Sequence, residues 1–172
     1  MPAVLMVIAP EMFRDEEYEH PREVFERRGA TVTVASTEPG ICKGRFGLTA
    51  VADIALRDAS AEEYDAVVFV GGKGAQVFFD DQTAQGLAAS MYKAGKIVSA
   101  ICIAPTILAQ AGLLSGKRAT SFPSQEDVLR AAGALYTGNP VQTEGRIVTG
   151  IGPESAYGFG EAVADAMSLP SA

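Results

Sequence analysis

One of the two cysteines occupies a position from which a thiol could act as a nucleophile. Cys102 directly follows the apolar run Lys96–Ile101 and leads without a linker into a segment of helical composition. Pro105 is compatible with the first turn of a helix, where backbone amides have no partners anyway. The arrangement resembles a nucleophile elbow, and the positive end of the helix would favour the thiolate and lower the pKa of the thiol. The alternative is a small buried cysteine that only fills core space, as most free cysteines do.

Two glycines could supply backbone amides to the same site. Gly71 and Gly72 follow the apolar run Ala66–Val70, and glycine lets a chain turn sharply at the end of a strand. The amides of Gly72 and Ile103 could form an oxyanion hole, although the glycines could equally make a plain turn. A nucleotide site is disfavoured, because the third glycine of the dinucleotide fingerprint and a Walker A lysine followed by Ser or Thr are both missing.

A carboxylate could exchange a proton with this thiol. The acidic stretch Asp15–Glu17 follows the first apolar run, and Pro21 denies the carbonyl of Glu17 its usual helical hydrogen bond. We therefore expect an irregular first turn that could point a carboxylate inward, while acidic residues also commonly decorate helix N-termini. The only histidine, His20, is expected at the surface or an interface. Cys42, in a glycine-rich loop, is expected to be an exposed, incidental thiol and a secondary oxidation site.

Composition and charge exclude several functional classes. The net charge of −7 disfavours nucleic-acid binding, which needs a positive surface. One histidine and two distant cysteines do not make a metal site, and no cofactor is expected. No apolar run approaches the roughly 18 residues that span a bilayer, and the N-terminus is typical of a buried strand rather than of a signal peptide. We expect a cytoplasmic protein whose thiols stay free, with no membrane partner.

Short apolar runs alternate with segments of helical length along the chain. Because strand–helix–strand connections are right-handed parallel crossovers, this predicts an α/β fold with a doubly wound, mostly parallel sheet and helices on both faces, in one domain spanning 1–172. Ligands of such sheets bind beyond the carboxyl ends of the strands, where the glycine pair and Cys102 both fall. The expected strands are Ala3–Ala9, Thr31–Ala35, Ala66–Val70 and Lys96–Ile101, with a hairpin over Val141–Thr149. The expected helices are Glu16–Arg28, Gln82–Ala94, Ile103–Ala111, Ser124–Ala132 and one beginning at Glu154.

Six segments in order along the chain resemble the ThiJ/PfpI superfamily, whose fold is flavodoxin-like. They are Phe13–Glu17 with Pro21, Ala66–Gly72, Ala100–Pro105, Ala111–Gly116, Ala119–Pro123 and Val148–Pro153. By this resemblance Cys102 matches the reactive elbow cysteine and Glu17 the carboxyl that hydrogen-bonds its sulfur. Gly72 and Ile103 match the positions that donate backbone amides, and Gly71, Phe122 and Gly150 are expected to line the pocket. The resemblance also implies a homodimer, often with the helix bearing Glu17 near the interface.

The departures from the superfamily pattern concern proton carriers. Protease-type members have histidine directly after the cysteine, where this chain has Ile103, so peptide hydrolysis loses its base. Deglycase-type members have a histidine where this chain has Phe122, and Ser and Arg where it has Gly150 and Ile151. The pocket is therefore expected to be more apolar and poorer in proton carriers than in those relatives.

Three functions are compatible with these residues. The first is a cofactor-free enzyme that acts on reactive dicarbonyls or glycated groups, like a glyoxalase or deglycase, with Cys102 as the nucleophile and Glu17 as the proton carrier. The second is a stress-protective redox sensor in which Cys102 is oxidised without turnover. The third, a cysteine peptidase, is disfavoured by Ile103. The expected partner is thus a small-molecule aldehyde or an oxidant.

Overall fold

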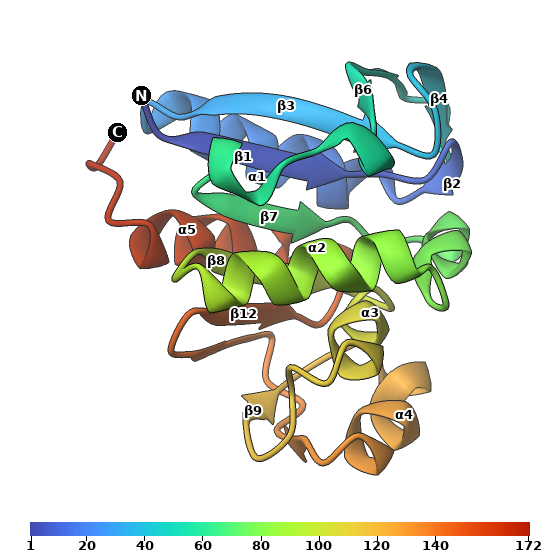
Figure 1. The fold of residues 1–172 in the computed structure, drawn as a ribbon, viewed down its shortest axis with the longest axis vertical. Coiled ribbons are helices and arrows are strands. Elements are labelled where there is room, and N and C mark those ends of the chain that lie inside the picture. Colours follow the sequence, from blue (N-terminus) through green and yellow to red (C-terminus); the bar gives the residue numbers. More distant parts are fainter.

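A seven-stranded sheet forms the centre of the computed structural model, which describes residues 1–172 (Figure 1). In order across the sheet, its strands are β11 (Val141–Glu144), β12 (Ile147–Gly150), β8 (Ile97–Ile101), β7 (Ala66–Phe69), β1 (Ala3–Val7), β3 (Thr31–Ser36) and β6 (Ile54–Ala55). All neighbours are parallel except the hairpin β11–β12. The parallel strands β3-β1-β7-β8-β12 follow the order 2-1-3-4-5 of flavodoxin-like folds, so the predicted fold class is confirmed.

Helices cover both faces of this sheet, as predicted. In Figure 1, α2 (Gln82–Lys93) lies in front of the sheet, whereas α1 (Asp15–Arg27) and α5 (Ala156–Ala166) lie behind it. The shorter helices α3 (Pro105–Gln110) and α4 (Glu126–Ala131) contribute to the same core as α2. Most predicted boundaries are correct to within two residues. No helix combines the length and the apolar character needed to cross a bilayer.

The continuous apolar run of β1 is explained by burial on both faces of the sheet. Val4 and Met6 point into the core under α1 and α5, whereas Leu5 and Val7 point into the core under α2 and α3. All four side chains are buried. Because successive residues of a strand face opposite sides, a strand covered on both faces cannot alternate apolar with polar residues.

A second, three-stranded sheet was not predicted from the sequence. It consists of β2 (Glu11–Phe13), β4 (Gly40–Gly44) and β5 (Thr49–Ala52). Cys42 lies in β4 and is only 1% exposed, so the expectation of an exposed loop thiol is wrong. The reason is strand alternation: Cys42 points into the core, while Ile41 and Lys43 point outward. A short parallel pair, β9 (Arg118–Ala119) with β10 (Leu135–Tyr136), completes the strands.

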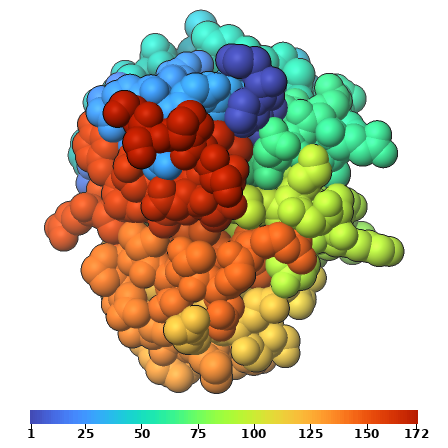
Figure 2. Space-filling view, turned by 90° about the vertical axis from the view of Figure 1, so that its left-hand side faces the viewer, coloured from blue at the N-terminus to red at the C-terminus, as the bar shows by residue number.

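The two ends of the chain lie close together. Met1 and Pro2 line the same small cavity as Ala166 and Met167, which end α5 and follow it. In Figure 2 the dark-blue N-terminal atoms and the dark-red C-terminal atoms occupy the same part of one face.

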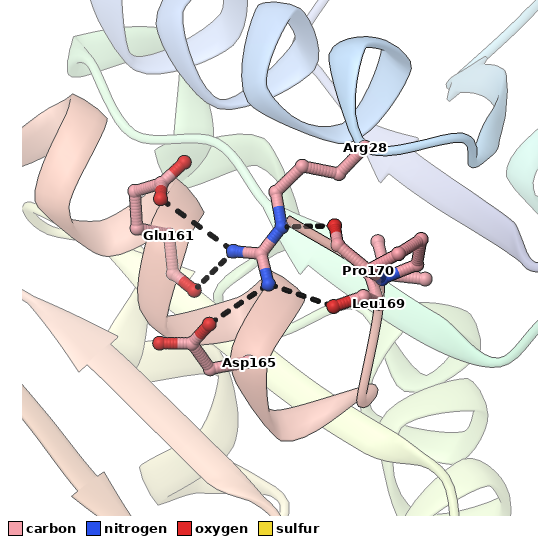
Figure 3. A network of polar contacts seen from close by, with 5 residues as sticks. All are labelled: Arg28, Glu161, Asp165, Leu169 and Pro170. Atoms are coloured by element: carbon pink, nitrogen blue, oxygen red, sulfur yellow. Dashed lines mark hydrogen bonds and ion pairs between the residues drawn. The ribbon is translucent and has the colours of Figure 1, made fainter. Parts of the chain in front are cut away.

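Arg28, at the end of α1, holds the C-terminal segment against the rest of the molecule (Figure 3). Its side chain is 7% exposed and donates to the carbonyl oxygens of Leu169 (2.8 Å) and Pro170 (2.9 Å). It also donates to the Asp165 carboxylate at 2.9 Å and lies near Glu161. The guanidinium therefore links α1, α5 and the last residues of the chain.

Candidate functional site

Cys102 lies on a strained turn between β8 and α3. Its φ angle is +65°, a left-handed conformation that costs a residue other than glycine about 1–3 kcal/mol. Two backbone hydrogen bonds hold it there: the Cys102 amide donates to the Gly150 carbonyl at 2.9 Å, and the Phe122 amide donates to the Cys102 carbonyl at 2.8 Å. Strain that the surroundings enforce in this way is typical of functional turns.

Glu17 lies inside the protein, behind this turn. It is fully buried, and neither carboxyl oxygen has a hydrogen-bond partner in ordinary geometry. The expected irregular first turn is wrong, because α1 is helical from Asp15 to Arg27 and includes Pro21. Glu17 points inward because it shares the buried face of the helix with Pro21 and Val24.

Gly71 is the point where Glu17 and Cys102 meet. A Cβ at this glycine would lie 2.6 Å from the Cβ of Cys102 and closer still to Oε1 of Glu17. The two side chains therefore pack against the same backbone position, which only glycine can occupy. The Gly71 carbonyl also accepts a hydrogen bond from the Arg14 amide at 3.0 Å, which fixes the start of α1 over this turn.

The pKa values of the two acids are shifted by their surroundings. Burial raises the pKa of Glu17 to about 8, opposed by the neighbouring Cys102 thiol and by the Arg14 guanidinium. Burial and then the charge of Glu17 raise the pKa of Cys102 to about 12, opposed by the amides of Gly72 and Ile103, which favour the thiolate. The expected lowering of the thiol pKa is therefore wrong, because burial beside a carboxyl outweighs those amides.

The raised pKa of Glu17 changes the chemistry of the pair. At neutral pH Glu17 is mostly protonated, and a neutral carboxyl no longer repels a thiolate. Once Glu17 has given up its own proton, its carboxylate can take the proton of the Cys102 thiol, and the pair then carries one negative charge, on sulfur. The arrangement can generate a nucleophile and return the proton to a substrate.

Cys102 opens onto a cleft of about 610 Å³. The cleft is lined by Arg14, Arg45, Gly72, Lys73, Gln76, Cys102, Ile103, Phe122, Pro123, Ser124, Ile151, Gly152, Pro153 and Glu154. Phe122 lines the cleft as predicted. Gly71 and Gly150 do not: Gly71 lies against Glu17 and Cys102, and Gly150 packs against Ile101 and Phe159.

Cationic side chains are the part of the cleft that the sequence analysis missed. Arg14, Arg45 and Lys73 all line it, together with apolar side chains such as Ile103 and Phe122. The three cations come from the start of α1, the β4–β5 turn and the segment after β7, which are far apart in the sequence. Nothing in a single sequence distinguishes such loop cations from solvated ones.

His20 is not in the cleft; it is half-buried and stacks on Tyr157, with ring centroids 4.0 Å apart.

The fold and this site define a flavodoxin-like α/β protein with a cysteine on a strained turn beside a buried carboxyl. The chain belongs to the DJ-1/PfpI family, whose model matches residues 2–166. It is similar to an uncharacterized protein of Methanocaldococcus jannaschii, with 41% identity over 91% of this chain and 78% of that protein. It is also 31% identical to a deglycase of Pyrococcus abyssi, over 90% of this chain and 93% of that one. A crystal structure of a ThiJ/PfpI domain protein from Brachyspira murdochii matches with a TM-score of 0.95 and 35% identity, over 98% of both chains.

Proposed function

We propose that this protein is a cofactor-free enzyme that removes reactive dicarbonyls or the adducts they form, with Cys102 as the nucleophile and Glu17 as the proton carrier. The observation that supports this most is the buried Cys–Glu pair on a turn that opens onto a cleft. Relatives named deglycases, each about 30% identical over 90% or more of this chain, agree with such a role.

The proposed reaction on a 2-oxoaldehyde is an internal oxidation and reduction that consumes one water. The Cys102 sulfur adds to the aldehyde carbon while Glu17 passes the thiol proton to the aldehyde oxygen, and the amides of Gly72 and Ile103 stabilise that oxygen in the hemithioacetal. Glu17 then moves the proton from the aldehyde carbon to the neighbouring carbon through an enediol, which leaves a thioester on Cys102. Water hydrolyses the thioester to a 2-hydroxy acid and restores the thiol. The aldehyde carbon is oxidised and the ketone carbon reduced, so no outside oxidant is required.

Methylglyoxal turnover by purified protein tests this proposal. We expect Cys102→Ser to abolish lactate formation and Glu17→Gln to reduce it by about 10²- to 10⁴-fold, the range for a general acid–base group. Cys42→Ser is the matched control, because Cys42 is buried in the small sheet and does not line the cleft. Turnover that survives in Cys102→Ser at the wild-type rate would refute the mechanism.

A second candidate function is protection or sensing through oxidation of Cys102. It is favoured by the cleft, in which no histidine accompanies the cysteine, and by amides that could hold a sulfinate. Two equivalents of peroxide would convert the thiolate first to the sulfenate and then to the sulfinate, with release of water. Mass spectrometry after mild peroxide treatment should then show two added oxygens on Cys102 and none on Cys42. Equal oxidation of both cysteines would count against this function.

No observation favours a peptidase.

We further propose that the protein acts as a homodimer in the cytoplasm. Both cysteines are free, and a reducing compartment keeps them so. The support for a dimer is an exposed apolar pair on the small sheet, Ile41 and Val51.

A further inference from the structure

The charge of the cleft is opposite to that of the molecule. The protein has a net charge of −7, yet the charged residues that line the cleft are Arg14, Arg45, Lys73 and a single acid, Glu154. Arg14 is already paired with Glu16 at 3.0 Å. Neither Arg45 nor Lys73 makes an ion pair or a side-chain hydrogen bond, so their charges remain available to a ligand.

The turn that carries Arg45 is held in place against the start of α1. The buried Asp15 carboxylate accepts hydrogen bonds from the amides of Phe46 (3.1 Å) and Leu48 (3.0 Å). The Arg45 amide itself donates to the Phe13 carbonyl at 2.9 Å. The backbone of Arg45 is thus fixed before any ligand binds, which reduces the entropy lost on binding.

Phe46 holds two of the cationic groups in position. The guanidinium of Arg14 lies 4.9 Å from the centroid of the Phe46 ring, and that of Arg45 lies 5.5 Å from it. Both distances fall within the range of cation–π attraction. The ring is 62% exposed, so both guanidinium groups beside it remain accessible from solvent.

We infer that the cleft selects aldehydes that carry a carboxylate, which Arg45 and Lys73 bind while the aldehyde carbon faces Cys102. This inference rests on the proposed function and narrows its substrate class from dicarbonyls in general to anionic 2-oxoaldehydes. Guanidinium and ammonium groups both bind carboxylates through charge-assisted hydrogen bonds. A cleft of about 610 Å³ has room for several atoms between the carboxylate and the reacting carbon. Phe46 is a positioning residue for Arg45.

A matched substrate pair isolates the effect of charge. The probe 4,5-dioxopentanoate and its methyl ester carry the same 2-oxoaldehyde and differ in one negative charge. We expect wild-type kcat/KM to be about tenfold higher for the anion, and Arg45→Gln and Lys73→Gln each to reduce this preference about threefold, as exposed ion pairs allow. Lys93→Gln is the control, because it removes the same charge from the exposed end of α2 and does not touch the cleft.

Phe46 variants test positioning separately. Phe46→Leu should raise KM for the anion while leaving kcat/KM for the ester unchanged, and Phe46→Tyr should restore the preference. A Phe46→Leu variant that loses activity equally on both substrates would mean that the residue is only structural.

A binding measurement distinguishes failure of this inference from failure of the proposed function. The dissociation constants of both probes are measured by NMR titration on Cys102→Ser, which cannot turn them over. If Cys102→Ser binds the anion more tightly than the ester, and Arg45→Gln/Cys102→Ser does not, the cationic site is supported even if the wild-type protein shows no turnover. Turnover of both probes without preference, or equal dissociation constants, overturns the inference and leaves the dicarbonyl activity intact.

Discussion

A carboxyl that keeps its proton at neutral pH is an unusual neighbour for a cysteine. Glu17 lies fully buried beside Cys102, and burial raises its pKa to about 8. In this state it can donate a proton to a bound oxygen atom, and the carboxylate that remains can then receive the proton of the Cys102 thiol. The same side chain is therefore suited to both halves of a proton transfer, which matters in a chain whose single histidine lies elsewhere.

The stability of the protein should report this ionisation. Between about pH 4.5 and pH 8 folded Glu17 holds a proton that unfolded Glu17 has released, so stability should fall as pH rises through this window. Within this window the ionisation of Glu17 should lower the free energy of unfolding by up to about 1.4 kcal/mol per pH unit. Urea unfolding at pH 5, 6.5 and 8 should show this decline in wild type and a much flatter profile in Glu17→Gln. Parallel profiles for the two proteins would show that Glu17 is ionised in the folded state.

The position of Cys102, its pairing with Glu17 and the pKa of its thiol could be predicted from the sequence to different extents. The position of Cys102 between a strand and a helix was visible in its neighbours, and the structure places it on a left-handed turn. Its pairing with Glu17 came from family resemblance, since 85 positions of chain separate them and no local pattern joins them. The pKa of the thiol was wrongly predicted, because burial is a property of the folded molecule.

The turn after β7 is the element on which the site depends most closely. Gly71→Ala would place a methyl group against Cys102, Glu17 and the Ile101 carbonyl, none of which can move without disturbing the others. We expect a loss of stability of about 2–4 kcal/mol, as overpacked and strained core positions show, together with loss of Cys102 activity. Thermal or urea denaturation and methylglyoxal turnover measure the two effects.

Gly86→Ala provides the opposite case in the same fold. Gly86 lies on the exposed side of α2, and no atom lies within 4 Å of its added Cβ. Alanine there should stabilise the protein by about 0.5–1 kcal/mol through helix propensity, without changing activity. If both alanine variants destabilised the protein equally, steric crowding at Gly71 would not be the cause.

Elements buried on both faces were easier to predict than those with one exposed face. The runs that form β1 and β7 are continuously apolar, and that of β8 is interrupted only by Ser99; their length and β-branched residues distinguish them from helices. In β4 and β5 the buried residues are Cys42, Ala50 and Ala52, which are too small to show a clear alternation. The glycines around them are typical of loops, so the small sheet was overlooked.

At the scale of the whole molecule, Arg28 joins the N-terminal half to the C-terminal tail (Figure 3). Arg28→Ala would leave the Leu169 and Pro170 carbonyls without their donor, and we expect a loss of about 2–4 kcal/mol. Arg28→Lys should recover less than half of this lost stability, because a single ammonium group lacks the planar guanidinium's several N–H donors and cannot reach all the acceptors. Hydrogen exchange should accelerate at residues 167–172 in both variants. An unchanged exchange rate there would mean that the tail is held by packing alone.

The outer face of the small sheet is the surface that we expect to form the dimer. Ile41 and Val51 are paired across β4 and β5, and they are 71% and 62% exposed. Adjacent exposed apolar side chains of this kind favour association with a second copy. Sedimentation should give a dimer for the wild type and a monomer for Ile41→Lys. Lys43→Glu, on the same strand, is a control for charge alone. A wild-type monomer, or a dimer unaffected by Ile41→Lys, would place the interface elsewhere or remove it.

The closeness of the two chain ends has a practical consequence for engineering. Because Met1 and Pro2 share a cavity with Ala166 and Met167, a short peptide could join the ends. New termini could then be opened at the exposed turn that contains Gly95, which precedes β8 and so lies at the edge of the sheet opposite Cys102. Such a circular permutant would retain every strand of the central sheet, and both junctions would lie far from the reactive thiol.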